Sequence, residues 1–259
     1  MEIFAAAVER LRRILENIQD FALFAAASIR AVFGRPFYMR ETMQQLYFAG
    51  VGSLLIVSIT SLVAGQALAL QLVRELAVSG AKGQLGHFMV ISVVRALGPV
   101  LIGMVVASRM SAGITAELGA MRSSDQLDAL VAFGSDPMKR LVVPRIVALV
   151  IALPVLTVIG DLLAVVGGGF VGVQYHLTWE TYNMGVLKFL TPKNLLVGMI
   201  KPFLFAVMIA VVACWKGFAS AGGAKGVGVS TTQSVVISTV GILLTDGICT
   251  RLIFRLLHW

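Results

Sequence analysis

The sequence predicts an all-α integral membrane protein with about five transmembrane helices, and three observations support this class. Of the 259 residues, 58% are hydrophobic and only 13% are charged, whereas about 25% of residues are charged in a typical soluble domain. The hydrophobic residues form long runs that reach the ~20 residues needed to cross a bilayer. The basic residues, which give a formal net charge of +8, lie in the gaps between these runs. This distribution is typical of a membrane protein and argues against a nucleic-acid partner.

The N-terminal segment, residues 1–45, is predicted to lie along the membrane interface. Between residues 8 and 33, apolar side chains recur at three- and four-residue steps, with charged side chains on the other side. This pattern is typical of an amphipathic helix, and its start is too polar to span a bilayer. The acidic residues near the start also argue against a secretory signal or a transit peptide. "GRPFYMRE" interrupts the helical pattern at residues 34–41.

Residues 46–259 form the predicted transmembrane domain. Its expected spans are residues 47–73, 87–113, 141–172, 195–219 and 232–256. The third span is long enough to be tilted or kinked, at Pro154 or at the glycine run that begins at Gly167. With the N-terminus in the cytoplasm, thirteen basic residues lie on the cytoplasmic side and six on the outer side. The positive-inside rule therefore predicts a multi-pass protein with a cytoplasmic N-terminus.

A polar segment at residues 117–133 separates the second and third spans. Its apolar residues tend to one side, its charged residues form a polar surface, and Gly134 and Pro137 end the helical pattern. The sequence therefore predicts a short amphipathic cytoplasmic helix. One interpretation is a solvated connector that rests on the membrane surface, and the other is a helix that docks into a cytoplasmic partner.

Four charged residues fall within or beside the apolar runs, namely Arg95, Asp161, Lys201 and Asp246. Each would cost roughly 2.5–3.5 kcal/mol at the centre of a lipid-facing helix, so they are expected to face protein, water or a polar ligand group. Lys201 lies near a span end, where its side chain can reach the interface, and a mostly structural role is expected for it. The two aspartates are expected to pair with basic residues on other helices, with substrate contact or proton transfer as alternatives.

Sequence motifs for catalysis, nucleotide binding or metal binding are missing. There is no GxxxxGK[ST] motif, and "GGAKG" at residues 222–226 favours a tight turn instead. The three histidines are scattered and no HExxH occurs, which argues against a membrane-embedded enzyme. No catalytic residue, metal site or cofactor is therefore predicted in this chain.

Several blocks of the sequence closely resemble the MlaE-type permeases of ABC transporters, membrane subunits that move lipids together with MCE-domain proteins. The blocks are "RETMQQLYFAGVGSLLIVSITSLVAGQALALQ", "RALGPVLIGMVVASRMSAGITAELGAMRSSDQLDAL", "DPMKRLVVPR" and "GGAKGVGVSTTQSVV". The resemblance extends from about Gly34 to the C-terminus in consistent order. One departure is Ala96, which stands where the family has a glutamate, so any role of that glutamate does not carry over.

The resemblance implies that residues 117–133 include the coupling helix that docks into a separate ATPase subunit. The residues expected there are Glu117, Met121, Arg122, Asp125, Gln126, Asp128 and Leu130. It also implies a lipid cavity between two copies of the chain, lined by the first, second and last spans. The residues expected in the cavity are Leu68, Leu72, Arg95 and Leu97. Arg95 either binds a lipid phosphate through bidentate hydrogen bonds or holds two helices together.

The partners implied are a second copy of the chain, two ABC ATPase subunits that bind ATP and Mg, membrane lipids and an MCE-domain periplasmic protein. A small cytoplasmic regulatory subunit is a further candidate. The resemblance favours the bacterial inner membrane, with a plastid envelope as the other setting. It does not specify the lipid, which is a phospholipid or another hydrophobic cargo, or the direction of transport. The alternative function is a proton-coupled secondary carrier that uses Asp161 and Asp246 as its relay.

Overall fold

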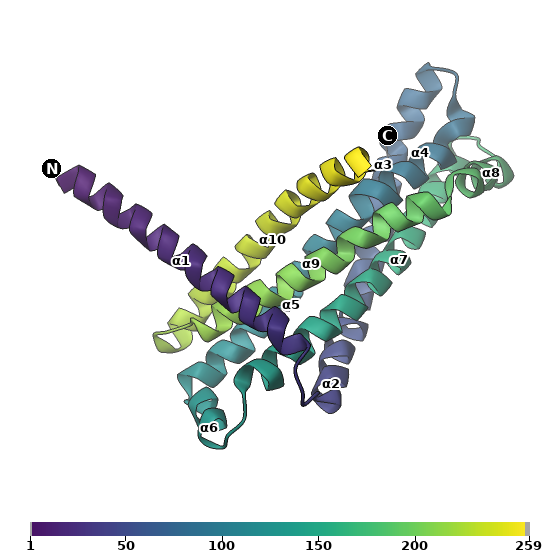
Figure 1. The fold of residues 1–259 in the computed structure, drawn as a ribbon. Helices are drawn as coiled ribbons and strands as arrows, with labels where there is room; N and C mark the ends of the chain where they lie inside the picture. The colour runs from purple at the N-terminus through teal and green to yellow at the C-terminus, as the bar shows by residue number, and fades with distance from the viewer. Residues whose placement is uncertain (1, 257–259) are drawn as a thin grey trace.

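The computed structural model describes residues 2–256, and within this range every regular element is a helix (Figure 1). Five helical segments are long and apolar enough to cross a membrane. They are Met39–Val78, Lys82–Ser123, Met138–Gln174, Pro192–Phe218 and Gly223–Ile253. These segments confirm the predicted class, an all-α membrane protein with five spans.

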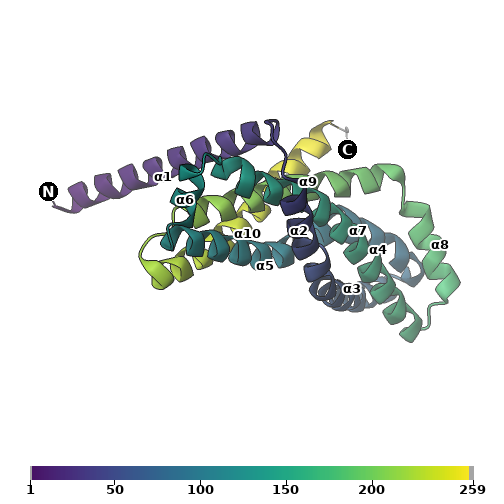
Figure 2. The same cartoon turned by 90° about the horizontal axis from the view of Figure 1, so that it is seen from below.

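Helix α1 (Glu2–Val32) runs along one side of the bundle, and its N-terminal part extends beyond it (Figures 1 and 2). It packs on α9 (Pro192–Phe218) through two pairs of aromatic rings. The rings of Phe21 and Trp215 meet edge to face at 5.3 Å, and those of Phe24 and Phe218 lie 5.8 Å apart. The second half of this amphipathic helix is therefore fixed to the bundle by its aromatic side chains.

The first span consists of two helices, α2 (Met39–Ala49) and α3 (Val51–Val78), which meet at Gly50. Arg109 from a neighbouring helix stabilises this junction. Its guanidinium donates 2.8 Å hydrogen bonds to the carbonyl of Phe48 and to the hydroxyl of Ser53. It also lies 4.6 Å from the centre of the Phe48 ring. Arg109 thus satisfies polar groups where the helix is interrupted.

The second span is irregular. It begins with η1 (Lys82–Gln84) and α4 (Leu85–Ser92), passes through a π-helical turn, η2 (Val93–Leu97), and continues as α5 (Gly98–Ser123). The π turn comes directly before Gly98 and Pro99. Pro99 has no backbone N–H, so one hydrogen bond of a regular helix is missing at this point. Helix α5 extends ten residues beyond the predicted end of the span at residue 113.

The third span starts with a second π turn, η3 (Met138–Val142), and continues as α7 (Val143–Gln174). Helix α7 stays unbroken through Pro154 and through the glycine run. These glycines allow close packing instead: Gly167 faces the backbone of Leu62 in α3, and Gly169 faces the Trp179 ring. Small residues at such contacts are typical of membrane helices. The glycine run therefore serves the close packing of α7 on its neighbours.

Helix α8 (Trp179–Phe189), which we did not predict, follows α7. It packs on α7 through Tyr182, whose hydroxyl donates a 2.6 Å hydrogen bond to the carbonyl of Val165. Burial raises the pKa of the Tyr182 phenol, which therefore stays protonated and serves as a donor.

Helices α9 and α10 (Gly223–Leu256) form the last two spans. The turn between them contains Gly222 and Gly223, with φ angles of +90° and +66°. These are left-handed conformations that glycine adopts most readily, which confirms the tight turn predicted for "GGAKG".

The main core lies between α5, α7, α9 and α10. In the most apolar 18-residue stretch of each span, only 22% of the first span and 17% of the last span is buried. At least 50% is buried in each of the other three spans.

Candidate functional site: a polar projection and two cavities

The polar segment between the second and third spans forms a projection at one end of the bundle (Figure 1). The prediction of one helix over residues 117–133 is wrong in detail. Residues 117–123 continue α5, and a separate helix, α6 (Gln126–Ala132), follows a sharp bend. Asp125 makes this bend with a φ of +56°, a left-handed conformation that aspartate tolerates better than most residues. The projection is therefore a helix–turn–helix rather than a single rod.

Buried contacts hold the projection against the bundle. Leu127 is only 3% exposed, and Met121 is half-buried against the main core. Glu117 accepts from Arg145 of α7 across 2.7 Å, and the Arg145 side chain is 3% exposed. An ion pair with one buried member holds its geometry better than a fully exposed pair does. The outer pair, Arg122 with Asp128 at 3.0 Å, is exposed on both sides and contributes little to stability.

The end of α6 is closed by a glycine cap. The N–H groups of Gly134 and Ser135 donate to the carbonyls of Val131 and Leu130 at 2.9 and 3.0 Å. Gly134 has a φ of +70°, so this is a Schellman-type end and confirms the predicted stop. The cap satisfies the last carbonyls of a helix that is only seven residues long.

The projection exposes both polar and apolar side chains. Asp125, Gln126 and Asp128 are exposed and form the predicted polar surface, while Leu130 is half-buried. Val131 and Phe133 are 59% and 86% exposed. The apolar side expected for a single helix over residues 117–133 included Val131 but not Phe133. The bend at Asp125 changes the face that each residue presents, and both are exposed. Both apolar side chains are therefore accessible on the outer surface of the projection.

Charged residues of the last two spans contact the second span at the π turn η2. The Nζ of Lys201 lies 2.7 Å from Oδ1 of Asp246 and donates a 2.9 Å hydrogen bond to the carbonyl of Arg95. The prediction that Asp246 pairs with a basic residue is confirmed. Lys201 does not reach the interface as expected, because its side chain is only 2% exposed. Its two contacts agree with the structural role that we predicted. A π turn leaves a backbone carbonyl without its usual hydrogen-bond donor from the same helix. Here Lys201 donates to such a carbonyl, that of Arg95.

Asp161 of α7 contacts the other side of this region. Its residue is 8% exposed, and its carboxylate lies so close to Gly98 that a Cβ at that position would collide with it. Oδ1 of Asp161 accepts no hydrogen bond within residues 2–256. The two aspartates therefore have different environments, and Asp161 does not share the Lys201–Asp246 ion pair.

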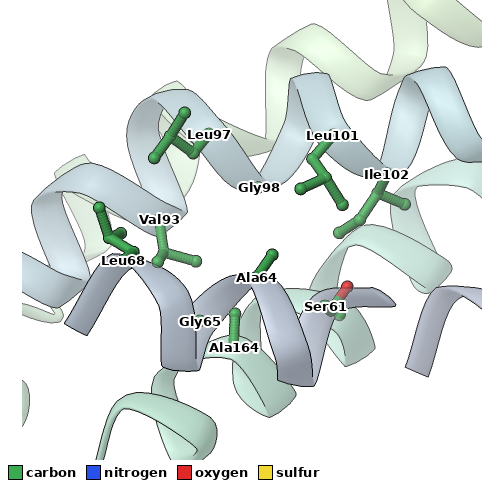
Figure 3. A pocket seen from close by; sticks show the side chains of 11 residues that line it. Ser61, Ala64, Gly65, Leu68, Val93, Leu97, Gly98, Leu101, Ile102 and Ala164 are labelled. Carbon is green, nitrogen blue, oxygen red and sulfur yellow. The ribbon is translucent and has the colours of Figure 1, made fainter. Parts of the chain in front are cut away.

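The four residues predicted to line a lipid cavity do not line one cavity within a single chain. Leu68 and Leu97 both line a cavity of about 70 Å³ between α3 and the π turn (Figure 3). Leu72 packs beside the buried cluster around Val73. Arg95 lines a separate cavity of about 340 Å³ with Lys201 of α9 and Thr250 of α10. Arg95 and Leu97 are two positions apart, which places them on different faces of a helix.

Comparison with known proteins identifies close relatives of this chain. The family described as Permease MlaE matches residues 42–252. A "Probable ABC transporter permease protein" of Rickettsia bellii is 37% identical over 249 residues, which cover 95% of this chain and 96% of the relative. The chloroplastic protein TRIGALACTOSYLDIACYLGLYCEROL 1 of Arabidopsis thaliana is 35% identical over 84% of this chain and 63% of its own length. A probable ABC transporter permease of Synechocystis is 34% identical, over 83% and 82% of the two chains.

Proposed function

This chain belongs to the MlaE permease family, and from this premise we propose that it is the membrane subunit of an ABC transporter that moves lipid. The names of the bacterial relatives support the transporter class. The plant relative's name refers to a galactolipid, which supports a lipid cargo. Phospholipid is the cargo we expect in a bacterial inner membrane. ATP and Mg are bound by the ATPase partner rather than by this chain.

The fixed projection is the single observation that carries this proposal. A permease without a nucleotide site must receive movement from its ATPase through a rigid part. The Glu117–Arg145 ion pair and buried Leu127 connect the projection to α7 and to the core. Pressure on the exposed tip would therefore reach α5 and α7 directly. In this role Val131 and Phe133 join the predicted coupling residues as contacts to the ATPase.

The cargo cavity is proposed to form between two copies of the chain. The cavities at Leu68 and at Arg95 lie beside the first and last spans, which a single chain leaves largely exposed. Pairing of two copies through these spans would join the cavities into a larger apolar space with Arg95 in its wall. A lipid phosphate is a suitable ligand for that guanidinium. Asp246 is occupied by Lys201, so a proton relay through both aspartates gains no support.

The membrane setting completes the proposal. We place the N-terminus and the projection in the cytoplasm, according to the distribution of basic residues, and the chain in a bacterial inner membrane. Helix α8 then faces the periplasm, where an MCE-domain protein would exchange lipid with the cavity. A small regulatory subunit would bind on the cytoplasmic side.

Purification of the tagged chain from its native membrane in mild detergent tests the proposal. We expect mass spectrometry to identify an ATP-binding cassette subunit, an MCE-domain protein and bound lipid. The double variant D125K/D128K should lose the ATPase while remaining folded in the membrane, because both side chains are exposed. Lysine in the left-handed conformation at position 125 should lower the stability by only about 1–2 kcal/mol. Phe133→Ala should weaken the same association by about 30-fold if Phe133 is an interface hot spot.

Leu187→Ala is the matched control for Phe133→Ala, because Leu187 is 72% exposed but lies on α8, away from the projection. It should leave ATPase binding unchanged. Recovery of the chain alone, with transport driven by a proton gradient, would overturn the proposal. An intact and active complex from D125K/D128K would overturn the role of the projection.

A further inference from the structure

A groove on the outside of the bundle is separate from the cavities at Leu68 and Arg95. It runs between α2 and α3 on one side and α7 on the other and has a volume of about 590 Å³. Its lining is almost entirely apolar and includes Met43, Tyr47, Leu54, Ile151, Val155 and Ile159. Tyr47 and Val155 are 69% and 54% exposed. Because the groove lies within two membrane spans, hydrocarbon is its natural filling.

The length of the groove fits one leaflet of a bilayer. From Met43 to Leu54 the chain advances about 16 Å at the rise of an α-helix, close to half of the ~30 Å hydrocarbon core. Its volume is also within the ~300–1,000 Å³ of small-molecule sites. One extended acyl chain, rather than a compact ligand, matches this shape.

Basic residues precede the groove in both segments that lead into it, at the start of α2 and at η3. They are Arg35, Arg40, Lys139 and Arg140. The Nζ of Lys139 donates a 2.9 Å hydrogen bond to the carbonyl of Arg35. The Arg140 guanidinium lies 5.9 Å from the centre of the Tyr38 ring, and Tyr38 precedes α2 directly. These contacts bring the two basic segments together, although they are about one hundred residues apart in the sequence.

Arg40 connects this basic cluster to the groove. It lies three residues before Met43 on α2 and therefore on the same side of the helix, and its side chain is exposed. The nearby carboxylates are Glu41 and Asp136, and Asp136 already accepts a 2.9 Å hydrogen bond from the backbone of Met138. These two segments thus carry four cations and two carboxylates, and the excess positive charge lies on the chain just before the Met43 end of the groove.

We propose that this groove binds one acyl chain of an anionic phospholipid from the surrounding bilayer, with its phosphate held by the basic cluster. The lipid would bridge α2 and η3 and so stabilise the contact between the first and third spans. An apolar transmembrane helix of another protein would fill the groove but would leave the cations unmatched, which is why charge complementarity favours an anionic lipid. The site is outside the proposed cargo cavity and does not depend on ATPase coupling.

Photo-crosslinking with diazirine-bearing lipids tests this proposal. The purified full-length chain is reconstituted in phosphatidylcholine vesicles that contain the photoreactive probe as either phosphatidylglycerol or phosphatidylcholine. We expect the phosphatidylglycerol probe to label residues 43–54 and 151–159 preferentially. The double variant R40Q/R140Q should reduce this labelling by about tenfold, because each cation near a membrane surface contributes to anionic lipid binding.

Two matched controls separate this site from ordinary lipid contact. Arg74→Gln removes an exposed arginine at the far end of α3 and should leave the labelling unchanged. Val155→Trp should block labelling of the groove, whereas Val166→Trp, also at an exposed position of α7, should not. Thermal unfolding checks that every variant remains folded.

Equal labelling by the two probes, or no effect of R40Q/R140Q in a folded protein, would overturn the proposal. The same labelling can be repeated on the complex purified from native membranes. If the groove residues then crosslink to another protein and not to lipid, a partner helix occupies the groove and the proposal is overturned. Neither result bears on ATPase binding, so the lipid site and the transporter function are tested separately.

Discussion

At the scale of single residues, Lys201 shows how a charge is accommodated inside the bundle. Its ammonium group contacts the carboxylate of Asp246 and the carbonyl of Arg95 within 3 Å. The lysine therefore links α9, α10 and the π turn of the second span. Removing one member of a buried ion pair leaves the other charge uncompensated, which costs more than removing an exposed pair.

We expect Lys201→Met to reduce the free energy of unfolding by about 3 kcal/mol. Asp246→Asn should also destabilise the protein, because it leaves the ammonium group of Lys201, which is only 2% exposed, without its counter-charge. Thermal unfolding in detergent measures both. Lys225→Met, at an exposed position in the first turn of α10, is the control and should be neutral. Equal stability of Lys201→Met and the native protein would show that the ion pair is not structural.

At the scale of helices, the contact between α3 and α7 depends on residues without side chains. Gly65 of α3 lies against the backbone of Ala164, and Gly167 of α7 lies against the backbone of Leu62 (Figure 3 shows Gly65 and Ala164). Without a hydrophobic driving force between helices in lipid, such close packing supplies much of the association energy. This contact also forms the floor of the cavity at Leu68.

Gly65→Ala should destabilise the protein by about 1–3 kcal/mol, because the new methyl group would overlap a helix backbone that cannot move aside. Gly228→Ala provides the opposite case, since a Cβ there meets nothing within 4 Å. In that variant the better helix propensity of alanine should stabilise α10 by about 0.5–1 kcal/mol. Chemical or thermal unfolding of the two variants in the same detergent distinguishes them. The same sign of change in both would contradict the proposed packing.

At the scale of the whole molecule, the spans are unequally covered. The second, third and fourth spans contribute most of the buried core, while the first and last remain mostly exposed in one chain. Lipid covers an exposed apolar helix without cost, so exposure alone does not require a partner. The position of the Leu68 and Arg95 cavities beside these two spans is what favours pairing there.

Native mass spectrometry should detect a dimer with twice the 27.6 kDa mass of one chain. The double variant V240A/L244A removes exposed apolar side chains from α10 and should lower the dimer fraction, because packing drives helix association in membranes. Phe203→Ala truncates an equally exposed side chain on α9 and should not. A monomer under all conditions, or equal effects of the two changes, would contradict a dimer formed through the last span.

Much of the molecule follows from the sequence alone, because hydrophobic runs and charge placement act over short distances. The five spans, the amphipathic N-terminal helix, the stop at Gly134 and the glycine turn before α10 all depend on local patterns. The π turn beside Gly98 and Pro99 also has a local signal. The polar character of the projection was evident, and so was the need for Asp246 to have a partner.

Tertiary structure alone decided where side chains point and what they meet. The left-handed Asp125 divides the projection and exposes Phe133, which helical periodicity over residues 117–133 does not reveal. Lys201 turns inward because a carbonyl and a carboxylate from two other helices lie within its reach. The pairing of Arg145 with Glu117, and the basic cluster beside the groove, join residues far apart in the chain. A hydrophobic pattern indicates which residues avoid water, but inside a membrane lipid and protein are both apolar, so only the packed structure determines which side chains face each of them.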